Sequence, residues 1–265
     1  MHALIPSTIK RKSQIETIVK GFIETVGLHY DDGGISLSQL IQLANSLPVI
    51  PDYNVTFEKI RFDPELYLGQ VYLRSHIISL NSLVRMDRIP FILGHEIGHI
   101  ALNHSSPTTD KDKNERIKAR QKQEIEANYF AHCLVMPQKI FCSAATLENY
   151  RFRTLSERLN LSREYVMKRY VTLKKNSIYF EIQDGKTFHF FHTNPSNLFK
   201  LYSSSTSAKR FIDKHKLNNE FKAYKQVNIQ FEGDIYDCKI FNTKTEFGKW
   251  VIQCIGVKNE CGWQI

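Results

Sequence analysis

The sequence predicts an α+β fold in which a helical region is followed by a β-rich one. Apolar residues recur at helical spacing through most of the chain before residue 176. After that point aromatic and β-branched residues alternate around hairpin turns such as Asp184-Gly185. We therefore expect a mainly helical region with a small sheet at 1–150, a helical segment at 151–176 and a β-rich region at 177–265.

The region before residue 88 predicts two helices and two or three strands. The helices are expected at 8–28 and 36–47, the second with Ser36 or Ser38 as its cap, and the strands at 54–62 and 68–81. The strand "HIISLN" ends at Asn81 and offers an edge on which an extended peptide would add. In the β-rich region, five strands are expected around a partly helical stretch, "SNLFKLYSSSTSAKRFIDKHK".

Bulk properties narrow the class of protein. A chain of 265 residues with 42% hydrophobic residues is long enough for a substantial core. The start has no apolar run of signal-peptide length, and no stretch is apolar enough to span a membrane, so we expect a cytoplasmic protein without membrane contact. Five cysteines without a C-x-x-C pair favour reduced, packed thiols. The formal charge of +9 is compatible with nucleic-acid binding, but solvent-exposed basic residues on helix faces explain this charge equally well.

The first group of candidate functional residues lies in "RIPFILGHEIGHIALNH", residues 88–104. Pro90 suits the first turn of a helix, and the apolar residues around the motif predict that this helix is buried. His95 and His99 lie four positions apart, so their imidazoles share one face and can bind a single metal ion. Two buried histidines need polar partners, and a shared metal satisfies that need.

A catalytic zinc site needs a third protein ligand. Glu124 is our candidate, because it opens "EIEANYFAHCLVMP" on a helix expected at 116–135. Glu126 is the rival, but at 100° per residue it points about 200° away from Glu124. Asn128 lies one turn beyond Glu124 and is placed to hydrogen-bond a ligand histidine. His104 and His132 are candidate donors to the transition state, although nothing in the spacing selects between them.

These two blocks resemble the ImmA/IrrE family of metallopeptidases, whose signature is H-E-x-x-H followed by E-x-x-A-N-x-F-A-x-x-L-x-M-P. The resemblance covers roughly residues 10–175. It implies a zincin-like domain with one Zn²⁺ per chain, for which Mn²⁺ can substitute, held by His95, His99 and Glu124. Glu96 would be the general base that activates zinc-bound water. The family further implies a regulatory endopeptidase that cleaves a helix-turn-helix repressor, often in stress responses.

A different class of protein is also compatible with the sequence. The segment 151–176 has a helix-turn-helix pattern, with Ser162 as a cap and with four basic residues that could contact phosphates: Arg158, Arg163, Lys168 and Arg169. The alternative is therefore a DNA- or partner-binding regulator whose metal site is structural or catalytically decayed. The two classes differ at Glu96, which a structural site does not need and which this sequence retains. The region 177–265 resembles no family that we can place.

Overall fold

Two units follow one another along the chain in the computed structural model, Met1–Val166 and Met167–Ile265. The structure describes residues 5–30, 34–46, 53–59, 68–104, 112–148, 152–173, 177–183, 186–192, 224–231, 234–244 and 250–258. The divisions expected at residues 150 and 176 stay predictions.

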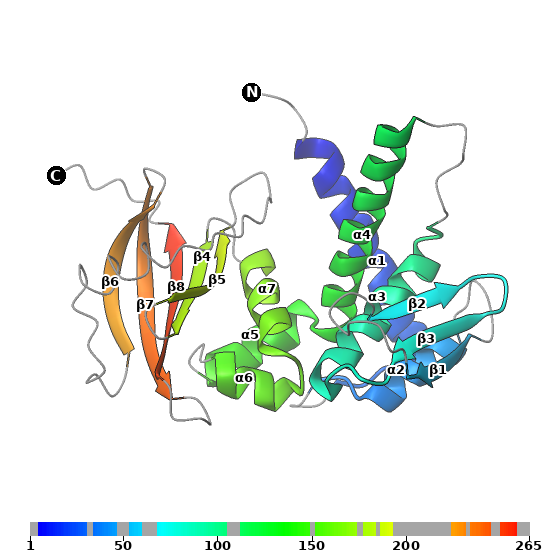
Figure 1. The fold of residues 1–265 in the computed structure, drawn as a ribbon, viewed down its shortest axis with the longest axis horizontal. Coiled ribbons are helices and arrows are strands. Elements are labelled where there is room, and N and C mark those ends of the chain that lie inside the picture. The colour runs from blue at the N-terminus through cyan, green and yellow to red at the C-terminus, as the bar shows by residue number, and fades with distance from the viewer. Residues whose placement is uncertain are drawn as a thin grey trace. The chain divides into compact units, whose positions relative to one another are not determined.

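Helices form most of the first unit, as Figure 1 shows. They follow the apolar periodicity of the sequence. They are α1 (Ile5–Val26), α2 (Leu37–Asn45), α3 (Ile89–Ala101), α4 (Lys113–Val135), α5 (Gln138–Leu147), α6 (Phe152–Leu159) and the first residues of α7 (Arg163–Leu173). A single 3₁₀ turn, η1 (Met86–Arg88), leads into α3. The four helices predicted before residue 136 are confirmed.

Local capping fixes where two of these helices begin. Ser36 caps α2, because its hydroxyl accepts a hydrogen bond from the backbone of Gln39 at 3.2 Å, and the Gln39 side chain accepts one from the backbone of Ser36 at 3.1 Å. The Ser162 hydroxyl likewise accepts from the backbone N–H of Tyr165 at the start of α7. The helices α6 and α7 occupy the segment with the helix-turn-helix pattern, and its role in DNA binding stays a prediction.

Helix α5 was not expected from the sequence. Met136-Pro137 ends α4 as predicted, but Pro137 also stands at the N-terminal cap of α5, so a new helix begins at once. Its buried residues Phe141, Ala144 and Ala145 have the i, i+3, i+4 spacing of a helix face. This spacing was the available signal.

A three-stranded sheet lies next to the helices, with strands β1 (Asn54–Glu58), β2 (Gly69–Tyr72) and β3 (Ile77–Asn81). Its order is β1-β3-β2, with β1 parallel and β2 antiparallel to β3. The expectation that "HIISLN" offers a free edge is therefore wrong, since this strand is β3 and has a partner on each side. In the described part of this sheet, β2 is an edge strand, and it contacts α3.

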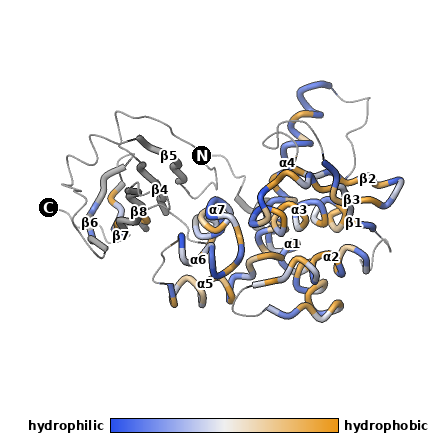
Figure 2. The backbone as a smooth tube through the Cα atoms, turned by 60° about the horizontal axis from the view of Figure 1, so that its bottom comes forward, coloured by the Kyte–Doolittle hydropathy of each residue, from blue (hydrophilic) through white to orange (hydrophobic). Residues whose placement is uncertain are grey.

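Helix α3 is the most apolar helix of the first unit, and Figure 2 shows hydrophobic and hydrophilic residues along its length. It contacts α2, α4, β2 and β3, and its Leu93 and Ile97 are fully buried. Burial on several sides explains why the apolar residues surround the helix rather than forming one stripe. Among the helices that the structure describes, none has both the length and the apolar character needed to cross a bilayer.

The second unit contains an antiparallel sheet of five described strands. They are β4 (Ser177–Gln183), β5 (Lys186–His192), β6 (Tyr224–Phe231), β7 (Asp234–Lys244) and β8 (Trp250–Lys258), in the order β5-β4-β8-β7-β6. Side chains of β7 alternate, with Tyr236, Cys238 and Ile240 buried and their neighbours Asp237 and Lys239 exposed. The stretch 196–216, expected to be partly helical, lies outside the described residues.

Candidate metal centre

The two histidines of α3 lie on one face of the helix, as their spacing predicts. His95 and His99 point their Nε2 atoms toward each other, 3.0 Å apart. Their side chains are 17% and 19% exposed, so the site is partly open to solvent. An open side is what a catalytic metal needs for water or substrate.

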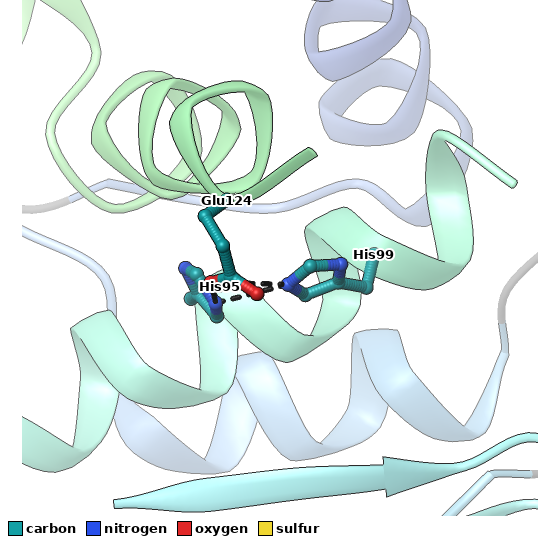
Figure 3. Close-up of side chains that lie close together, drawn as sticks. All are labelled: His95, His99 and Glu124. Carbon is teal, nitrogen blue, oxygen red and sulfur yellow. Dashed lines mark hydrogen bonds and ion pairs between the residues drawn. The ribbon is translucent and has the colours of Figure 1, made fainter. Parts of the chain in front are cut away.

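Glu124 reaches this pair from α4, as Figure 3 shows. Its Oε2 lies 3.3 Å from Nε2 of His95 and 3.8 Å from Nε2 of His99. Ligand atoms about 2.1 Å from a tetrahedral zinc ion are roughly 3.4 Å apart. The three residues thus form a group of suitable size for one ion, and no other such group of three or more occurs among the described residues.

Asn128 determines which nitrogen of His95 faces the site. The side-chain oxygen of Asn128 lies 3.1 Å from Nδ1 of His95, so a neutral ring carries its proton on Nδ1 and donates it to the amide. Nε2 then presents a lone pair to the position between Glu124 and His99. Asn128 therefore lies where it was expected, one turn beyond Glu124 on the same face of α4, and its support of a metal ligand stays a prediction.

The charges of these side chains suit a bound cation. Without a metal, hydrogen bonding to His95 and His99 holds the pKa of Glu124 well below its usual value, although partial burial opposes this effect. Burial lowers the pKa of His95, but the hydrogen bond and charge of Glu124 and the charge of Glu96 outweigh it, so this pKa is raised overall. A carboxylate and two imidazoles meet here, and a divalent ion would neutralise the one and use the lone pairs of the others.

Two glycines of α3 allow α4 to come close enough to deliver Glu124. A Cβ atom on Gly98 would lie 3.1 Å from Cδ1 of Phe130 and 3.2 Å from the carbonyl oxygen of Ala127. One on Gly94 would lie 2.9 Å from Cγ2 of Val135. Both glycines are buried. The two glycines were not among the predicted site residues, although their own spacing of four places them on one helix face.

Glu96 lies close to His95 and His99 and contacts the edge strand β2. Its side chain accepts a hydrogen bond from the backbone of Val71 in β2, and the residue is only 8% exposed. Burial raises the pKa of Glu96, and the charges of His95 and His99 oppose this rise without cancelling it. A carboxyl group with a raised pKa is suited to take up and release a proton.

Gly69 makes room for this contact. A Cβ atom there would lie 2.9 Å from Cγ2 of Ile92 and 3.4 Å from Oε1 of Glu96. Gly69 and the backbone of Val71 were not predicted, because the sequence pattern alone does not show which strand contacts α3.

Of the remaining candidate residues, His104 lies next to this centre. His104 contacts His99 through the two Nδ1 atoms, 3.0 Å apart, and therefore lies on the side of that ring away from Nε2. His132 is 5% exposed, with its ring against that of Phe91 at a centroid distance of 4.7 Å. Glu126 faces Arg11 and His104 rather than the three metal-site residues, as its angle from Glu124 predicted.

The first unit thus has the donor set of a mononuclear metallopeptidase-like domain, with two ligands from one helix and a third from the next. Residues 52–170 match the family model of the IrrE N-terminal-like domain, peptidase M78, so this part of the chain is similar to that family. The matched segment contains the three metal-site residues and the small sheet. Helix α1 precedes it.

A solved structure described as a transcriptional regulator from Mycobacterium tuberculosis is similar in fold. The TM-score is 0.57 at 15% sequence identity, and the match covers 92% of this chain and 88% of that chain. At this identity the similarity concerns the fold alone. Comparison with curated proteins gives no match.

Proposed function

We propose that this chain is a zinc-dependent endopeptidase of regulatory type whose substrate is a helix-turn-helix transcriptional repressor. The observation that carries the proposal is the convergence of Nε2 of His95, Nε2 of His99 and Oε2 of Glu124, with the buried Glu96 beside them. The family supports the peptidase activity. The description of the similar solved structure as a transcriptional regulator supports a regulatory role.

His95, His99 and Glu124 would hold one Zn²⁺, or Mn²⁺ in its place. When bound, the metal supplies a Lewis acid that polarises the peptide carbonyl and lowers the pKa of water from 15.7 to about 7. Glu96 takes a proton from the attacking water and returns it to the leaving amine nitrogen, because its buried carboxyl retains affinity for a proton. Asn128 keeps His95 oriented throughout.

The substrate would bind in extended form along β2 rather than β3. Strand β2 is at an edge of the described sheet, and the Val71 backbone is directed to Glu96. A peptide that pairs with such an edge gains main-chain hydrogen bonds, and its alternate side chains contribute specificity. The scissile carbonyl would then lie near Glu96. His132 stays a candidate for stabilising the oxyanion.

Two substitutions distinguish the proposed role of Glu96 as general base from the proposed role of His95 as metal ligand. Glu96→Gln should retain about one zinc per chain and lose cleavage of the co-expressed repressor, whereas His95→Ala should lose the metal. Glu115→Gln is a matched control, because this acidic residue is exposed on α4. Metal content is measured by elemental analysis and cleavage by the appearance of repressor fragments.

Two results would contradict the proposal. Wild-type protein that binds no metal would remove its basis. Full biological activity of Glu96→Gln would instead favour the DNA- or partner-binding regulator, in which the metal is structural. In that class α6 and α7 would contact DNA, although Arg158 of α6 already binds Glu148 at 2.9 Å.

A further inference from the structure

A chain of polar contacts continues from the metal centre to α1. Nδ1 of His104 lies 3.0 Å from Nδ1 of His99, and Nε2 of His104 lies 3.4 Å from Oε2 of Glu126. The same oxygen accepts hydrogen bonds from Arg11, at 2.7 Å from Nη2 and 3.0 Å from Nε. Arg11 and Glu126 are 115 positions apart in the sequence.

The direction of these hydrogen bonds follows from their end point. Glu126 can only accept when it is ionised, so His104 presents an N–H at Nε2. The neutral His104 ring then has its lone pair at Nδ1, which accepts the proton of His99 Nδ1. With that proton on Nδ1, the lone pair of His99 is at Nε2, the atom that faces Glu124 and His95.

Burial makes the contacts specific. The side chains of His104 and Glu126 are 7% and 10% exposed, so each requires a partner inside the protein. Arg11, at 36% exposure, places two donors on one carboxylate oxygen, as a charge-assisted pair. Lys122 also approaches Glu126, but at 3.9 Å and with 76% exposure it contributes little.

We propose that Arg11, Glu126 and His104 are positioning residues that fix the tautomer and ring orientation of the metal ligand His99. The inference rests on the proposed function, because it requires a metal at the centre. It assigns to His104 the support of a ligand, where the sequence suggested a donor to the transition state. It also makes α1, which precedes the matched segment, part of the metal site.

The experiment measures zinc affinity by competition with a chromophoric chelator, which needs no peptidase activity. Arg11→Ala and Glu126→Gln should each weaken zinc binding about tenfold, and His104→Ala more strongly, up to about 100-fold. Arg11→Lys should recover part of the loss, because it keeps the charge but not both donors. Lys20→Ala is the matched control, since Lys20 pairs with Glu24 on the exposed face of the same helix.

A second readout separates positioning from general damage. In the Co²⁺-substituted protein the visible d–d bands should shift in His104→Ala and Glu126→Gln and stay unchanged in Lys20→Ala. Circular dichroism of the metal-free variants checks that they fold. The inference is refuted if the folded variants Arg11→Ala, Glu126→Gln and His104→Ala bind zinc within twofold of wild type and have unchanged cobalt spectra. That result would leave the proposed metal site itself unaffected.

The outcome also distinguishes this inference from the proposed function. If zinc binding depends on Arg11 and Glu126 but the protein cleaves no repressor, the result supports the role of the positioning residues. The same result contradicts the proposed substrate. A wild-type chain that binds neither zinc nor cobalt would overturn both.

Discussion

The side-chain oxygen of Asn128 lies 3.1 Å from Nδ1 of His95, so α4 supports a histidine of α3 as well as supplying the carboxylate of Glu124. Glu124 and Asn128 are four positions apart and lie on one face of α4. The rotation of α4 about its own axis therefore determines the positions of both Glu124 and Asn128.

Asn128→Ala should weaken zinc binding roughly 10–100-fold, because the ring of His95 loses the acceptor that fixes its tautomer. Chelator competition measures the effect. Gln121→Ala is the control, since Gln121 is exposed on the same helix. Equal zinc affinity of both variants would show that packing alone orients His95.

Gly98→Ala should weaken zinc binding and lower the free energy of unfolding. The added methyl group would meet Phe130 and the Ala127 carbonyl at 3.1–3.2 Å, and overpacking of this kind costs about 1–3 kcal/mol. Gly21→Ala is the control, because nothing lies within 4 Å of the Cβ position there. It should be neutral or stabilise α1 by roughly 0.5–1 kcal/mol. Urea unfolding of both variants gives the comparison.

The stability of the metal-free protein should depend on pH through Glu124 and His95. The lowered pKa of Glu124 adds stability that is present above its unfolded value near 4.5 and is lost as the pH falls. The raised pKa of His95 adds stability that is present below its unfolded value of 6.5 and is lost as the pH rises. Both contributions are present together at about pH 5.5.

Thermal unfolding of wild type and Glu124→Gln tests this expectation. The difference in Tm between them should be larger at about pH 5.5 than at about pH 8, with both proteins free of metal. A difference that is the same at both values would mean that the pair contributes no pH-dependent stability.

Zinc should stabilise the folded chain, and its removal by a chelator should reverse the effect. At a free zinc concentration 100 times the Kd, the expected gain is about 2.7 kcal/mol. His99→Ala should lose this gain. His29→Ala should keep it, because His29 is an exposed histidine outside the centre. Equal stabilisation of the His99→Ala variant would indicate binding elsewhere.

Much of the centre could be predicted because its residues belong to regular patterns. The spacing of His95 and His99 and the rotation that separates Glu124 from Glu126 follow from helix geometry alone. Asn128 follows from the same geometry. These residues lie in two continuous segments, and a helix fixes the relative directions of its own side chains.

The features that could not be predicted depend on contacts between segments that are far apart in the sequence. The pattern of "HIISLN" shows a strand but not its neighbours, so its central position in the sheet was not predicted. The partner of Glu126 is on α1, and no local signal connects Arg11 to it. The close approach of α3 and α4 likewise depends on both helices, although only one carries the glycines.

The position of Glu124 along α4 has a consequence for the order of that helix. Residues 113–122 are exposed except for Ala119, so Glu124 lies where α4 first meets the body of the unit. Helix ends fray when no tertiary contact holds them. A metal bound to Glu124 would anchor the helix at this point and should slow amide hydrogen exchange in the exposed turns before it. Amide hydrogen exchange in the exposed turns of α4 would then depend on metal occupancy, although these turns do not contact the ion.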